Sequence, residues 1–212
     1  MALAAEVAAV AGRLTTPIWR AKIHKSLSKN KHLANSRYVQ LATVREDGRP
    51  ANRTVVFRGF LSDDDDSLTF VTDSRSRKVQ EVAANPAAEV AWYFPQTREQ
   101  YRIAGNLVIV DSASADSALQ QARTRTWSAM SDGGRQQFGW PQPGRPRAAE
   151  DPEAWNQPAP GSQDPPLDTF CLVVLRVEEV EQLLLRSNER FRYSRDVKQD
   201  GSMAWAEESI NP

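Results

Sequence analysis

Residues 68–78 have the sequence LTFVTDSRSRK, and this stretch decides how the rest of the chain is interpreted. Its first five residues favour extended structure and predict a strand over residues 68–72. A short helix is predicted over residues 76–85, because the Asn85-Pro86 pair would end it there. The chain is therefore expected to pass directly from a strand into the first turn of a helix.

Positive charge is concentrated at the start of this helix, where Arg75, Arg77 and Lys78 lie close together. The N-terminal end of a helix already carries a partial positive charge, so these cations call for a compensating anion. Free backbone N–H groups, the Ser76 hydroxyl and the cations could hold a phosphate. The alternative is a solvent-exposed basic turn that pairs with neighbouring carboxylates such as Glu81.

The remaining pattern predicts about seven or eight short strands, connected mostly as hairpins, with a few helices between them. The expected strands cover residues 38–44, 52–60, 88–94, 100–110, 169–177, 190–193 and 203–206. A turn over 46–48 and a bulge at Gly105 are also expected. This arrangement favours a mainly β, antiparallel barrel with attached helices over a doubly wound sheet. The dinucleotide-binding, P-loop and nucleophile-elbow motifs do not occur.

We interpret residues 1–212 as a single domain with two less regular parts. The N-terminal segment, about residues 1–34, is expected to be helical, with Thr16 as the cap and Pro17 as the first helical residue. A second helix is expected over residues 116–130. A proline-rich stretch over about residues 141–166 lacks apolar periodicity and is expected to form a long irregular loop.

Composition excludes several classes of function. The 27 basic and 27 acidic residues balance, so nothing draws the whole protein toward nucleic acid or an anionic membrane. The single cysteine, Cys171, cannot form an intrachain disulfide and is expected to be buried. Two histidines and one cysteine make a metal site improbable, and the run Asp63–Asp66 is interpreted as a solvated turn rather than a calcium loop.

Localisation is predicted only broadly. No apolar stretch reaches the roughly 20 residues that span a bilayer, so no membrane attachment is expected. The start, Met1 to Leu14, lacks the basic region of a secretory signal. We therefore expect a soluble intracellular protein of the cytoplasm or of an organelle, a plastid included.

Two further polar positions qualify as candidates for ligand binding. Arg53 and Arg58 flank the apolar residues of the sequence RTVVFR. Residues five apart in a regular strand face opposite sides, so both could address one point only if a bulge intervenes. Otherwise one arginine would hold a cofactor phosphate and the other a substrate phosphate. Gln100 begins a strand, and its amide could both donate to and accept from a ring edge.

These pieces together resemble a known family. RTVVFR (53–58), FVTD (70–73), SRK (76–78), REQ (98–100) and ERFRY (189–193) occur in the order and spacing of the pyridoxamine 5′-phosphate oxidase flavin site. The likeness covers roughly residues 35–110 and 170–212. The runs GRPANRTVVFRGF (48–60), WYF (92–94) and FGWP (138–141) are similar to an oxidase-like branch found in cyanobacteria and plants.

The resemblance implies an FMN-binding split β-barrel that forms a homodimer, with FMN between two subunits. The implied cofactor-binding residues are Arg53, Thr54, Val55, Val56, Arg58, Val71, Thr72, Ser76, Arg77, Lys78, Gln100 and Arg190. Arg190 would reach the flavin from the partner subunit. Arg58 and Arg186 would contact a phosphorylated small-molecule substrate. Val180 and Asn188 stand where the family carries tryptophan and histidine. This sequence therefore departs from the family more at the substrate-binding part of the site than at the phosphate-binding part.

The implied function is an FMN-dependent oxidase similar to pyridoxamine/pyridoxine 5′-phosphate oxidase, acting in vitamin B6 metabolism. No catalytic residue or general base is nominated. Two alternatives remain open: an FMN-dependent NAD(P)H reductase on the same fold, and a non-catalytic protein that binds flavin or pyridoxal phosphate.

Overall fold

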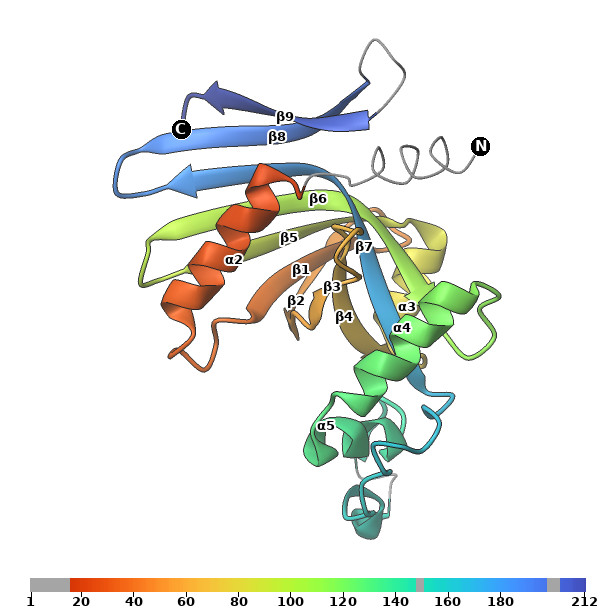
Figure 1. The fold of residues 1–212 in the computed structure, drawn as a ribbon. Helices are drawn as coiled ribbons and strands as arrows, with labels where there is room; N and C mark the ends of the chain where they lie inside the picture. The colour runs from red at the N-terminus through yellow and green to blue at the C-terminus, as the bar shows by residue number, and fades with distance from the viewer. Residues whose placement is uncertain (1–15, 148–150, 198–202) are drawn as a thin grey trace, which may run out of the picture.

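The computed structural model describes residues 16–147, 151–197 and 203–212, and its core is one antiparallel sheet (Figure 1). The expectation for Met1 to Leu14 lies outside the described residues. The strands are β1 (Tyr38–Val44), β2 (Pro50–Val56), β3 (Gly59–Phe60), β4 (Leu68–Asp73), β5 (Ala87–Phe94), β6 (Glu99–Val110), β7 (Phe170–Leu184), β8 (Glu189–Val197) and β9 (Met203–Ile210). Their order is β2-β1-β5-β6-β7-β4-β3, and β8 joins β7 to β9. The expected mainly β, antiparallel architecture is confirmed.

Strand β7 gives the sheet its shape, because it changes partner along its length. Its first residues pair with β4, with Val173 opposite Phe70. Its last residues pair instead with β8, while β6 pairs with it from Leu172 to Leu184. The sheet therefore divides at the middle of β7, and Figure 1 shows β7 bending there.

The bend coincides with the expected bulge at Gly105. The register between β6 and β7 shifts between Ala104 and Gly105. A Cβ atom added to Gly105 would lie 2.0 Å from the carbonyl oxygen of Arg176 on β7. The two backbones can approach this closely only because residue 105 has no side chain.

We predict that Gly105→Ala lowers the free energy of unfolding by about 3 kcal/mol, since backbone atoms of β7 must move to admit the methyl group. Urea unfolding would measure the change. Gly133→Ala is the matched control, because a methyl group added at Gly133 would have no neighbour within 4 Å. Equal stability of the Gly105 and Gly133 variants would contradict this account of the bulge.

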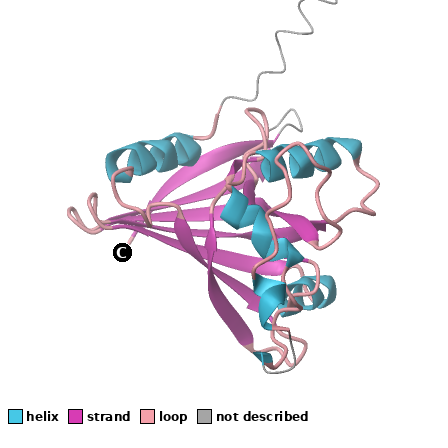
Figure 2. Ribbon diagram, turned by 90° about the horizontal axis from the view of Figure 1, so that it is seen from below, coloured by secondary structure: helices cyan, strands magenta, loops and turns pink. Residues whose placement is uncertain are grey.

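Helices cover the ends and one face of the sheet (Figure 2). They are α2 (Ile18–Asn30), α3 (Arg77–Ala84), α4 (Ser117–Ser128) and α5 (Asp132–Gln136), with 3-10 turns η1 (Gln137–Gly139) and η3 (Pro152–Trp155). Trp19 and Ile23 of α2 are fully buried in the main core. The expected cap is wrong: Pro17 caps α2, because its carbonyl accepts from the N–H groups of Arg20 and Ala21.

The expected single strand over residues 52–60 is also wrong, since the chain leaves β2 after Val56 and resumes as β3 at Gly59. Gly59 has a φ of 144°, which L side chains rarely adopt. The Arg58 N–H donates to the Thr69 carbonyl at 2.8 Å. The sequence analysis required a bulge for Arg53 and Arg58 to address one point. The break between β2 and β3 serves instead, since both arginines line one cavity.

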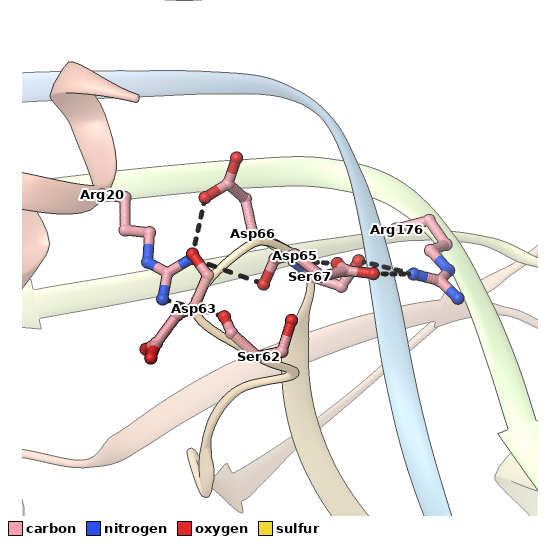
Figure 3. A network of polar contacts seen from close by, with 7 residues as sticks. All are labelled: Arg20, Ser62, Asp63, Asp65, Asp66, Ser67 and Arg176. Atoms are coloured by element: carbon pink, nitrogen blue, oxygen red, sulfur yellow. Dashed lines mark hydrogen bonds and ion pairs between the residues drawn. The ribbon is translucent and has the colours of Figure 1, made fainter. Parts of the chain in front are cut away.

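The acidic run between β3 and β4 is more ordered than the expected solvated turn (Figure 3). Arg20 of α2, which is 5% exposed, donates to the carbonyls of Ser62 and Asp63 and to the Asp66 carboxylate. Arg176 of β7 pairs with Asp65 at 2.6 Å. Two arginines thus dock this loop, although Asp63 and Asp64 stay exposed. No group of possible metal ligands occurs among the described residues.

Two other expectations can be compared with the structure. Cys171 is fully buried on β7, and burial raises the pKa of its thiol to about 11. The described helices include none that is long and apolar enough to cross a membrane.

Candidate functional site

The first turn of α3 has the features of an anion site. Ser76 is its N-cap, yet the Ser76 side chain makes no capping hydrogen bond. The first N–H groups of a helix have no partner inside the helix, so those of Arg77 and Lys78 are available. The Ser76 hydroxyl instead lies 3.1 Å from the Thr72 hydroxyl at the end of β4. The strand-to-helix junction thereby brings hydroxyl and N–H groups together.

Lys78 places a cation beside these groups. Its ammonium donates to the Thr72 hydroxyl at 2.8 Å and to the Ser76 hydroxyl at 3.2 Å. It makes no ion pair with any carboxylate of the described residues. Burial, and then the charge of Arg53, lower the pKa of Lys78. A cation among neutral oxygens is the arrangement that a bound phosphate would stabilise.

Arg53 approaches the same space from β2. Its guanidinium donates to the Thr43 hydroxyl at 2.6 Å and to the Glu81 carboxylate at 2.8 Å. Burial acts to raise the pKa of Glu81, but hydrogen bonds from Thr43 and Arg53 hold it below its usual value. Glu81 therefore stays charged and fixes the orientation of Arg53. Sequence reasoning treated Glu81 only as a pairing partner for a basic turn.

These groups surround a cavity of about 640 Å³. The expected site residues that line it are Arg53, Thr54, Val55, Val56, Arg58, Val71, Thr72, Ser76 and Lys78. Residues between 137 and 147, together with Trp155, form its other side. The structure thus brings nine of the expected residues together, and it adds a wall that sequence reasoning had left without a role.

Four expected residues do not line this cavity. The Arg77 side chain is exposed on α3. Gln100 and Arg190 are both in register with Leu183 of β7, so they lie in one row across β6, β7 and β8. The Arg190 guanidinium pairs with Glu181 at 2.6 Å, and that of Arg186 donates to the Gln96 carbonyl at 3.0 Å.

A second cavity of about 340 Å³ adjoins the first, since Val56 and Arg58 line both. Arg37 and Arg125 complete a group of three arginines around it, and no carboxylate of the described residues pairs with any of them. The Arg58 Nε atom is buried without a hydrogen-bond partner among the residues the structure describes. Burial, followed by the charge of Arg37, lowers the pKa of Arg58. The cavity is therefore electropositive and suits an anion.

Comparison with known proteins identifies the family. Residues 16–111 match the family described as pyridoxamine 5′-phosphate oxidase, FMN-binding domain. The chain is 38% identical over 194 residues to pyridoxine/pyridoxamine 5′-phosphate oxidase 2 of Arabidopsis thaliana, and the match covers 92% of this chain and 96% of that protein. The chain belongs to the pyridoxamine 5′-phosphate oxidase family. Its cofactor is FMN.

Other family members agree with this assignment. A pyridoxamine 5′-phosphate oxidase-related, FMN-binding protein of Nostoc punctiforme has a crystal structure that superimposes with a TM-score of 0.84. It is 42% identical, and the match covers 93% of this chain and 99% of that chain. Pyridoxine/pyridoxamine 5′-phosphate oxidase of Hyphomonas neptunium is 31% identical over 184 residues, covering 84% of this chain and 78% of that protein. The sheet is thus the split barrel that the resemblance implied.

The residues present fit FMN. The uncapped helix start, the Ser76 and Thr72 hydroxyls and the Lys78 ammonium suit its phosphate. Val55, Val56 and the rest of the cavity offer the apolar and backbone surface that a planar ring needs. The individual contacts remain predictions.

We predict that Lys78→Ala lowers FMN affinity roughly tenfold to a hundredfold, because one charge-assisted hydrogen bond is lost. Fluorescence titration of the apoprotein with FMN measures this directly. Arg77→Ala should lower FMN affinity less than Lys78→Ala does, since the Arg77 side chain is exposed and outside the cavity. Unchanged affinity of the Lys78 variant would reject the phosphate site at α3.

Proposed function

We propose that this protein is an FMN-dependent oxidase whose substrate carries an anionic group, with pyridoxamine or pyridoxine 5′-phosphate as the expected compounds. The proposal assigns it to vitamin B6 metabolism in the cytoplasm or an organelle. The observation that carries it is the group of three arginines beside the FMN cavity. The names of the Arabidopsis and Hyphomonas relatives support the same reaction.

Arg58 is the proposed link between cofactor and substrate. It lines both cavities, so a group bound to it would lie next to the FMN site. Its buried Nε lacks a partner among the described residues, and leaving a buried donor unpaired costs free energy that an anion would recover. A guanidinium binds phosphate with a fork of donors rather than with a point charge. Arg37 and Arg125 would add charge around the same anion.

Bound FMN supplies the two-electron oxidation, with dioxygen as the final acceptor. The protein residues contribute orientation and electrostatics. Lys78, Ser76 and Thr72 would hold the cofactor phosphate, and Arg58 would hold the substrate so that its amine- or alcohol-bearing carbon faces the ring. The positive field of the arginines would favour the reduced, more negative flavin.

A homodimer forms part of the proposal. Within one chain Gln100, Arg190 and Arg186 lie outside the FMN cavity. The row that holds Gln100 and Arg190 also contains Tyr93, which is 47% exposed. If a second copy covered this face, these residues would reach the partner's FMN, as the family resemblance implies.

The test is turnover of FMN-loaded protein with pyridoxamine and pyridoxine 5′-phosphates and with the unphosphorylated forms. Turnover is measured as the production of hydrogen peroxide. We predict that Arg125→Ala raises KM for the phosphorylated compounds on the order of tenfold, because it lines only the substrate cavity. FMN affinity should not change. Arg49→Ala is the matched control, since that exposed arginine pairs with Asp47 in the β1–β2 turn.

The other outcomes are distinguishable. Turnover with NADPH but with no vitamin B6 compound would contradict the oxidase and indicate a reductase. Tight FMN binding without turnover of any of these compounds would indicate a binding protein. An equal KM for phosphorylated and free forms would reject the arginine cavity as the anion site.

A further inference from the structure

The irregular segment after α4 forms one side of the FMN cavity. Residues from Gln137 to Arg147 and Trp155 supply half of the residues that line the cavity, opposite β2 and β4. The proposed oxidase reaction assigns nothing to this segment. Its position implies that it contacts the cofactor rather than solvent alone.

This segment is fixed at its base. Phe138 is buried against Trp127 and Phe170, and its carbonyl accepts from the Thr169 hydroxyl at 2.7 Å. Arg135, which is 3% exposed, donates to the Pro160 carbonyl at 2.8 Å and so ties the far end of the same segment to α5. Of the part between these anchors, the described residues from Trp140 to Arg147 and Trp155 lie against the cavity.

A second hydrogen bond attaches this segment at the phosphate end of the cavity. The Arg75 guanidinium donates to the Trp140 carbonyl at 2.8 Å. The same guanidinium is held by two hydrogen bonds to Asp73, of 2.9 and 2.7 Å. Arg75 immediately precedes Ser76, the N-cap of α3, so the segment is attached where the phosphate is expected.

The side chains of the wall pack on one another. The rings of Trp140 and Trp155 lie 5.6 Å apart, and the Arg147 guanidinium lies 4.3 Å from the centre of the Trp155 ring. All three residues line the cavity. The Trp140 indole N–H is buried without a partner among the described residues, and a bound oxygen acceptor would satisfy it.

We propose that Trp140, Arg147 and Trp155 form a retaining wall that holds the phosphate and ribityl half of FMN in the cavity. The Trp140 indole donates to an oxygen of that half, and Arg147 adds positive charge beside it. Arg75 is a positioning residue that holds the wall at the phosphate end through the Trp140 carbonyl. The inference rests on FMN as the cofactor and not on the identity of the substrate.

The experiment measures the rate at which FMN leaves the protein. FMN-loaded protein is mixed with an excess of apoflavodoxin, and the flavin signal follows the transfer. We expect Trp140→Phe, Trp155→Ala and Arg75→Ala each to accelerate dissociation on the order of tenfold, with a smaller change in association rate. Arg75→Lys should restore part of the retention, because lysine can still donate to the carbonyl.

Arg195→Ala is the matched control, since Arg195 lies 5.2 Å from the Trp205 ring in a similar stack outside the cavity. Its dissociation rate should equal that of the wild type. Arg147→Gln changes an exposed side chain, so it tests the wall without loss of folding. Wild-type dissociation rates, within about twofold, for both the Arg147 and Trp155 variants would overturn the proposal. Because the readout is flavin release, absence of oxidase activity in the wild type would contradict the proposed function without changing this test.

Discussion

The Lys78 ammonium, held by two neutral hydroxyls at the start of α3, is the interaction on which the site depends. Burial makes this charge costly, and both the helix terminus and Arg53 add positive potential. The nearest carboxylate on α3, Glu81, is engaged with Arg53 and Thr43. A cofactor phosphate completes this arrangement, because it is an anion that can accept from the ammonium, the hydroxyls and the helix N–H groups together.

The fold positions these groups through one strand. The end of β4 pairs with the start of β7, with Asp73 opposite Phe170, and the chain turns from there into α3. The close approach at Gly105 lets β6 follow the bend of β7. The break after Val56 then turns Arg58 toward the space that Arg53 also faces. Cofactor cavity and arginine cavity therefore share a wall, which places an anionic substrate next to the flavin.

Much of this could be predicted from sequence, since strand and helix patterns are local. The hairpin turn at Gly48, the bulge at Gly105 and the helix after Ser76 follow from residue types alone. In the cluster that lines the FMN cavity, Ser76, Lys78, Arg53 and Arg58 followed from local charge and position. Thr54, Val55, Val56, Val71 and Thr72 followed only from a family resemblance. Long-range pairings were not predictable: Arg20 and Arg176 dock the acidic run from distant elements. Arg37 and Arg125 likewise carry no local signal, because Arg37 precedes β1 while Arg125 lies on α4, which packs against β6 and β7, and only the tertiary fold brings both to Arg58.

The central claim is that this chain holds FMN at the start of α3. The most direct measurement is the absorbance spectrum of the purified protein, followed by denaturation and identification of the released flavin. The account predicts a two-band flavin spectrum and about one FMN released per chain, and it predicts FMN affinity roughly tenfold to a hundredfold weaker when Lys78 is replaced by alanine. A colourless protein that also fails to take up added FMN would contradict it.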